Sequence, residues 1–70
     1  MVRVLLVEDE LRLAETVRDG LTEAGHSVEV QHTGPDGLWA ATNRTFDVVV
    51  LDIMLPGLSG YRVLRALRAE

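Results

Sequence analysis

The sequence predicts an α/β protein built on a parallel sheet, and two features indicate this class. Residues 4–7 and 48–51 are short apolar runs rich in branched side chains, as in buried strands. Segments with apolar residues at helical spacing alternate with these runs along the chain. The resulting order, strand–helix–strand–helix–strand–helix with short linkers, favours parallel strands joined by right-handed crossovers.

The first half of the chain predicts a strand over residues 2–7 and a helix from Asp9 or Glu10 to about Ala24. Gly25 follows this helix as a stop signal. Apolar side chains recur at intervals of three and four and form one stripe: Leu11, Ala14, Val17, Leu21 and Ala24. Residues 27–31 then alternate between apolar and polar side chains, which is typical of a half-exposed edge strand.

The second half predicts a helix that opens at Thr33-Gly34-Pro35 and ends near Asn43-Arg44. Proline is tolerated in the first turn of a helix, where its missing N–H leaves no bond unmade. Residues 46–51 form the third predicted strand, and residues 52–59 form a loop. A third helix is expected to start at Ser59 or Gly60 and to continue to the end of the sequence.

These patterns predict the strand order 2-1-3, with the alternating strand at one edge. The first and third strands look buried on both faces, because their apolar runs are uninterrupted. The first helix is expected on one face of the sheet and the other two on the opposite face. The third strand would nevertheless lie at an open edge, which favours pairing with another chain. We therefore expect that these 70 residues are part of a domain. If the chain truly ends at Glu70, we expect it to be either poorly stable alone or self-associated through the third strand as a homodimer.

Composition narrows the functional class. The net charge of −4 argues against a nucleic-acid surface, which needs clustered Lys and Arg. The chain has no cysteine and hence no thiolate metal site. No stretch resembles a signal peptide, and no apolar run approaches the ~20 residues that span a bilayer. We expect a cytoplasmic protein that does not associate with a membrane.

Carboxylates follow two of the predicted strands at the point where each ends. Glu8, Asp9 and Glu10 follow the first strand, and Asp52 follows the third. Adjacent parallel strands would bring these side chains into the crevice where open α/β sheets bind ligands. Crowded carboxylates favour a hard divalent cation such as Mg²⁺. Glu10 is instead expected to stabilise the start of the first helix through the helix dipole.

Two segments resemble the receiver domain of two-component response regulators. They are VLLVEDE, ending in Glu10, and LDIMLPGLSG, ending in Gly60. The pattern Asp-x-Met-Leu-Pro-Gly-x-x-Gly is most similar to the OmpR/PhoB-type winged-helix transcriptional regulators. The resemblance implies a flavodoxin-like receiver fold, with residues 1–70 as its N-terminal part. Strands 4 and 5 and the output domain would then be missing from this sequence.

The resemblance also implies the roles of the site residues. Asp52 would be the phosphoacceptor and a Mg²⁺ ligand, with Asp9 as the second carboxylate ligand. The backbone carbonyl of Met54 would be the third protein ligand, and Glu8 would act mainly through bound water. The donor of the phosphoryl group would be a sensor histidine kinase. Such a domain is a signalling module rather than an enzyme.

The remaining residues of the second segment are implied to shape the site. Pro56 and Gly57 would shape the loop after Asp52, and Gly60 would permit close packing where the third helix begins. A complete receiver also has a Thr or Ser after strand 4 and a Lys after strand 5, and this sequence contains no lysine. The full-length protein is expected to bind DNA, whereas these residues alone are not.

Other site classes fit the residues less well. A dinucleotide-binding domain needs Gly-x-Gly-x-x-Gly after the first strand, where Glu8-Asp9-Glu10 stands. A haloacid-dehalogenase-type phosphatase has a second Asp at the position of Met54, and a flavodoxin-type FMN site needs a Ser/Thr-rich phosphate loop. The alternative that stays open is a truncated or degenerate receiver-like module that acts by dimerisation without phosphotransfer.

Overall fold

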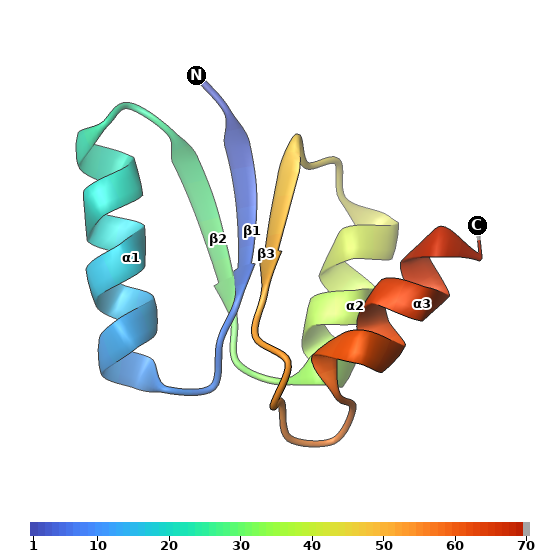
Figure 1. The fold of residues 1–70 in the computed structure, drawn as a ribbon. Coiled ribbons are helices and arrows are strands. Elements are labelled where there is room, and N and C mark those ends of the chain that lie inside the picture. Colours follow the sequence, from blue (N-terminus) through green and yellow to red (C-terminus); the bar gives the residue numbers. More distant parts are fainter. Residues whose placement is uncertain (70) are drawn as a thin grey trace.

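The computed structural model describes residues 1–69, in which strands and helices alternate as the sequence predicts (Figure 1). The elements are β1 (Arg3–Val7), α1 (Leu11–Glu23), β2 (Ser27–Gln31), α2 (Gly34–Asn43), β3 (Val48–Leu51) and α3 (Gly60–Arg68).

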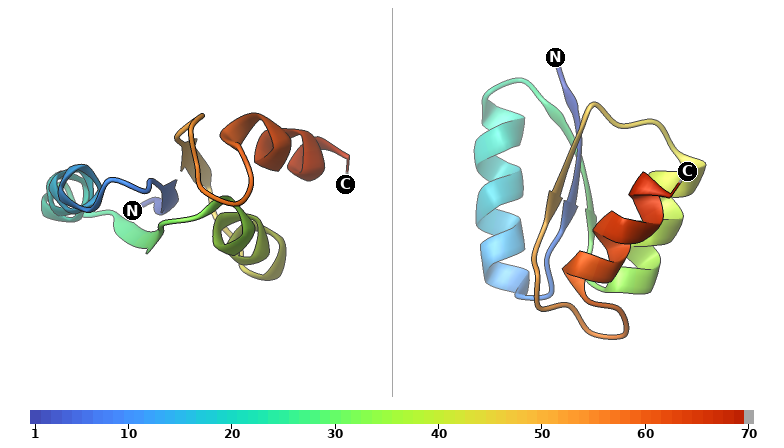
Figure 2. Two further views of the ribbon diagram at one scale, coloured as in Figure 1. Left: turned by 90° about the horizontal axis from the view of Figure 1, so that it is seen from below. Right: turned by 45° about the vertical axis from the view of Figure 1, so that its right-hand side comes forward.

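The strands form a parallel sheet in the order β2-β1-β3, which confirms the predicted order. Val4 of β1 pairs with Val28 of β2 on one side and with Val48 of β3 on the other. Helix α1 lies on one face of the sheet, and α2 and α3 lie together on the other face (Figures 1 and 2). This arrangement of the helices also agrees with the prediction.

The core is centred on β1, as expected of the middle strand. Its residues Val4, Leu5, Leu6 and Val7 are at most 4% exposed. Leu5 and Val7 pack in one cluster with apolar residues of α2 and of the loop after β3: Ala40 and Leu55, bordered by Ala41, Phe46 and Leu51. Because side chains alternate along a strand, Val4 and Leu6 face the opposite side, where α1 lies.

Helix α1 begins and ends close to the predicted positions. Glu10 caps its N-terminus, since its carboxylate accepts hydrogen bonds from the N–H groups of Arg12 and Leu13 at 3.2 and 2.8 Å. After the C-cap Ala24, Gly25 adopts a φ of 94°, which glycine tolerates without strain. The predicted apolar stripe is only partly correct: Ala14 is buried, Val17 and Leu21 are half-buried, and Leu11 and Ala24 are exposed.

Strand β3 differs from the prediction in its start and in its burial. It begins at Val48 rather than at residue 46, although the N–H of Asp47 already donates to the carbonyl of Arg3 at 2.8 Å. The N–H of Arg3 donates to Asp47 Oδ2 at 2.8 Å. Val48, Val49 and Val50 are 46%, 36% and 41% exposed, so the expectation that this strand is buried on both faces is wrong for residues 1–69. Within this part of the chain, β3 is an edge strand.

We predict that Leu5→Ala lowers the free energy of unfolding by about 2–5 kcal/mol, because it leaves a cavity beside Val7 in the core. Leu13→Ala is the matched control: this leucine is 48% exposed on α1, and its loss should change stability by only about 0.5 kcal/mol. Urea denaturation followed by circular dichroism measures both. Equal losses in the two variants would contradict the assignment of the core.

Candidate functional site

The site lies at the carboxyl ends of β1 and β3. The hydrogen bonding of the sheet continues there for one residue beyond the strands. Val7 of β1 pairs with Leu51 of β3, and the N–H of Asp52 then donates to the carbonyl of Val7 at 3.0 Å. On the other side of β1, the N–H of Glu8 donates to the carbonyl of Gln31 at 3.0 Å. Glu8 and Asp52 therefore leave the sheet side by side at the same edge.

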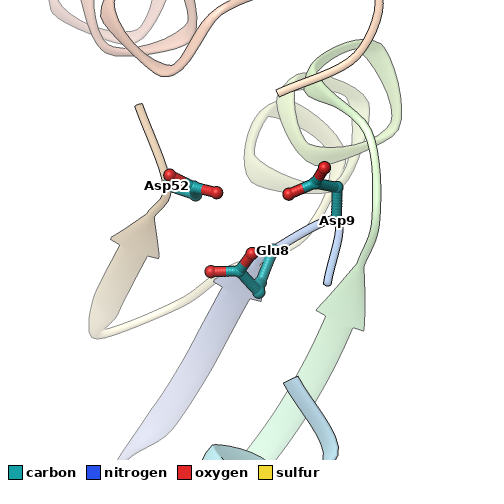
Figure 3. Close-up of side chains that lie close together, drawn as sticks. All are labelled: Glu8, Asp9 and Asp52. Carbon is teal, nitrogen blue, oxygen red and sulfur yellow. The ribbon is translucent and has the colours of Figure 1, made fainter. Parts of the chain in front are cut away.

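Three carboxylates converge at this edge, as Figure 3 shows. Glu8, Asp9 and Asp52 each offer one oxygen, and these oxygens all lie within 4.8 Å of one another. Glu8 and Asp52 are half-buried, whereas Asp9 is exposed. Mg²⁺ bonds to oxygen at about 2.0–2.1 Å and keeps several waters. Oxygens this close together suit a cation held by some of the carboxylates directly and by others through water.

The surroundings of Glu8 and Asp52 shift their pKa values in opposite directions. The N–H of Met54 donates to Asp52 Oδ1 at 3.2 Å, and this bond to the charged form lowers the pKa of Asp52. Burial raises the pKa of Glu8, and the neighbouring charge of Asp52 adds to that effect. The N–H of Glu10 donates to Glu8 Oε2 at 3.1 Å and opposes the rise. Of these two carboxyl groups, Glu8 therefore takes up a proton more readily than Asp52.

Glu10, the third acid of the run after β1, does not join the cluster. Its carboxylate is engaged by the first turn of α1, as the sequence predicts for a helix-start acid. Asp9 and Glu10 are adjacent and carry the same charge, but they have different roles. Asp9 points towards Asp52 (Figure 3), whereas Glu10 caps the helix.

The loop that follows Asp52 is compact and depends on two glycines. Gly57 has a φ of 81°, a conformation that residues with a Cβ rarely adopt. At Gly60, a Cβ would lie 2.8 Å from the Cα of Ile53 and would also collide with the carbonyl of Asp52. The N–H of Gly60 donates to the carbonyl of Ile53 at 2.9 Å. These contacts hold the start of α3 against the segment that carries Asp52 and Met54.

Two contacts close to the site are not predicted by the sequence. His32 Nδ1 lies 2.9 Å from the carbonyl oxygen of Glu8, and the N–H of Gly34 donates to the carbonyl of Pro56 at 3.2 Å. The sequence pattern around Gly34 indicates only the start of a helix. No local pattern signals either contact, because each joins segments more than twenty residues apart.

The fold and the acidic crevice define an α/β domain of the receiver class. The response regulator receiver domain family matches residues 4–70, and the chain belongs to this family. Among curated proteins, it is 42% identical over 67 residues to the transcriptional regulatory protein HprR of Escherichia coli (strain K12), covering 96% of this chain and 30% of HprR. It is 48% identical over 65 residues to YkoG of Bacillus subtilis, an uncharacterised transcriptional regulatory protein, covering 93% of this chain and 28% of YkoG.

Solved structures share the fold. The receiver domain of the Francisella response regulator 1452 has a TM-score of 0.96 at 29% identity, with 99% of this chain and 57% of that chain covered. TrrA from Thermotoga maritima, solved in complex with Mg(2+)-BeF, has a TM-score of 0.93 at 33% identity, with 99% and 60% covered.

These comparisons confirm the resemblance on which the sequence analysis relied. The relatives are transcriptional regulators of the OmpR/PhoB type, and the match covers their receiver part only. The chain spans about 30% of the length of HprR. Among residues 1–69, no helix combines the length and the apolar character that crossing a membrane requires.

We predict that the carboxyl carbon of Glu8 titrates at higher pH than that of Asp52 in metal-free buffer, because their pKa values are shifted in opposite directions. Asp52→Asn should lower the pKa of Glu8, since it removes the neighbouring charge. Carboxyl-carbon NMR measures both values, with Asp47→Asn at the far end of β3 as the control. A Glu8 titration that is indifferent to Asp52→Asn would contradict the coupling.

Proposed function

We propose that Asp52 is a phosphoacceptor, which takes a phosphoryl group from a histidine kinase with the help of Mg²⁺. The observation that carries this proposal is the group of three carboxylates within 4.8 Å, at the ends of adjacent strands in a receiver domain. The relative TrrA supports it, because TrrA has been solved both with Mg(2+)-BeF and in complex with the histidine kinase ThkA.

In the proposed reaction, Asp52 acts as the nucleophile. Its lowered pKa keeps the carboxylate ionised at neutral pH, with a lone pair available for attack. A carboxylate oxygen forms a bond to phosphorus, and the bond from phosphorus to the donor histidine nitrogen breaks. The bonding pair returns to the imidazole, which is left neutral or takes up a proton from water. The product is an acyl phosphate on Asp52.

Mg²⁺ would be held by Asp9, Asp52 and the backbone carbonyl of Met54, with Glu8 reaching it through bound water. Three hard carboxylates at one edge form a donor set that suits this cation. When bound, Mg²⁺ supplies positive charge that offsets the repulsion between the carboxylates and an incoming phosphoryl group. The protein's own contribution is to orient the Asp52 carboxylate, through the N–H of Met54, beside Glu8 and Asp9.

For the whole protein, we propose a phosphorylation-controlled transcriptional regulator that acts in the cytoplasm. Residues 1–70 would be the N-terminal part of its receiver domain, and a separate output domain would bind DNA. The curated relatives HprR and YkoG support this assignment by their description as transcriptional regulatory proteins.

A second candidate function is an interaction module that dimerises without phosphotransfer. The exposed edge at Val48, Val49 and Val50 favours it, because unpaired backbone groups on an apolar edge can pair with another chain. A homodimer through this edge would be related by a two-fold axis, the usual symmetry of such pairs.

We predict that the full-length protein incorporates phosphate from acetyl phosphate when Mg²⁺ is present, and that Asp52→Asn abolishes the incorporation. Asp47→Asn is the matched control: it immediately precedes β3, at the end remote from the cluster, and its amide oxygen can still accept from Arg3. Phosphate-affinity electrophoresis and intact mass measure the product. No incorporation in the wild type would favour the dimerisation module instead, and full incorporation in Asp52→Asn would show that another residue is the phosphoacceptor.

We predict that Asp9→Asn weakens Mg²⁺ binding at least about tenfold, because it replaces a proposed carboxylate ligand by a neutral amide oxygen. Glu10→Gln is the matched control, since it removes the same charge from the next residue but keeps an oxygen for the helix cap. Isothermal titration calorimetry with MgCl₂ measures both affinities. Equal weakening in the two variants would show that total charge, rather than ligation by Asp9, governs binding.

A further inference from the structure

The N-terminus of α2 packs directly against the loop between β3 and α3. In Figures 1 and 2 this loop passes beneath the first turn of α2. The N–H of Gly34 donates to the carbonyl of Pro56 at 3.2 Å. A Cβ on Gly34 would lie 2.6 Å from the Cβ of Leu58 and would collide with the Leu58 carbonyl oxygen. A Cβ on Gly57 would lie 3.1 Å from Cδ of Pro35. The helix start and the loop therefore fit together without spare room.

Position 34 holds glycine because there is no room for a side chain, and not because of its backbone conformation. In residues 1–69, Gly25 and Gly57 are the glycines with positive φ, so Gly34 is not needed for a left-handed backbone. The Leu58 carbonyl oxygen occupies the space that a Cβ on Gly34 would need, and this is the physical reason that a side chain is excluded there.

The loop is connected to the carboxylate site through the backbone of Met54 and Ile53. Met54 lies two residues before Pro56, and its N–H donates to Asp52 Oδ1 at 3.2 Å. At the other end, the N–H of Gly60 holds the carbonyl of Ile53. The segment from Asp52 to Gly60 is thus fixed at its ends by the sheet and α3, and in its middle by Gly34. Met54 lies between the sheet end and the part of the loop that Gly34 holds, so we expect a shift in the middle to reach it.

We infer that Gly34 is a positioning residue for the cation site: by admitting the Leu58 carbonyl, it sets where the Met54 backbone and the Asp52 carboxylate lie. This inference rests on the proposed function, because it assigns a role towards the Mg²⁺ proposed to bind there. Gly34 itself touches neither the carboxylates nor a phosphoryl group; it acts through the loop.

The test is Gly34→Ala in the full-length protein, titrated with MgCl₂ by calorimetry. We expect Mg²⁺ affinity to fall about 10–100-fold, as when a residue that orients a ligand is replaced. Amide NMR shifts of Ile53 and Met54 in metal-free buffer should move as well, since the loop is displaced. While the variant stays almost fully folded, as its unfolding curve checks, a loss of stability alone leaves the dissociation constant unchanged.

Two other positions provide controls. Gly20→Ala, in α1, meets no atom within 4 Å and should leave Mg²⁺ affinity and the loop shifts unchanged. Ala41→Gly, about two turns along α2 from Gly34, adds no atoms and should lower stability while leaving the affinity unchanged. This pair separates displacement of the loop from general destabilisation of α2.

The outcomes distinguish this inference from the proposed function. Wild-type Mg²⁺ affinity in a folded Gly34→Ala variant would overturn the inference and leave the proposed function standing. A wild-type protein that binds no Mg²⁺ would overturn the proposed metal site itself. If Gly34→Ala does not fold, an NMR titration of the wild-type protein with MgCl₂ decides instead: the amide of Gly34, whose N–H donates to the Pro56 carbonyl, should shift with the same dissociation constant as the amide of Met54. A Gly34 amide that shifts in this way supports the inference, and one that is indifferent to Mg²⁺ overturns it.

Discussion

The parallel pairing of β1 with β3 is the constraint on which the rest of the structure depends. It sets Val7 opposite Leu51, and the next residue on each strand is then an acid at the same edge of the sheet. An antiparallel pairing would send Glu8 and Asp52 to opposite ends. The central position of β1 is in turn stabilised by burial of its four apolar residues between helices on both faces. The core and the site are therefore consequences of one strand register.

That register has an electrostatic cost, because carboxylates that repel one another are held close together. The backbone offsets part of the cost: the N–H groups of Met54 and Glu10 donate to Asp52 and Glu8. The raised pKa of Glu8 means that its ionisation opposes folding at neutral pH, and this cost disappears as pH falls through the ordinary range of a glutamate. A divalent cation would relieve the same repulsion without protonation, which ties stability to the proposed function.

The loop after Asp52 has the sequence of a turn, and contacts with α2 and α3 hold it in place. It contains Pro56 and Gly57 and borders Gly60, residues typical of a turn. In the fold, the start of α2 and the start of α3 close around it, and glycines permit the approach of backbone to backbone at Gly34 and Gly60. The space at these contacts and the hydrogen bonds from the N–H groups of Gly34 and Gly60 together govern where the loop lies.

The sequence by itself determined the strand order, the position of each helix and the acids at the strand ends. These depend on local periodicity, helix caps and turns, which are properties of neighbouring residues: Glu10 as a cap and Gly25 as a stop are examples. Tertiary structure decided the exposure of Val48 to Val50, the opposite pKa shifts of Glu8 and Asp52, and the contact of Gly34 with Leu58. Each of these depends on distances between residues far apart in the chain, and such distances exist only once the sheet has formed.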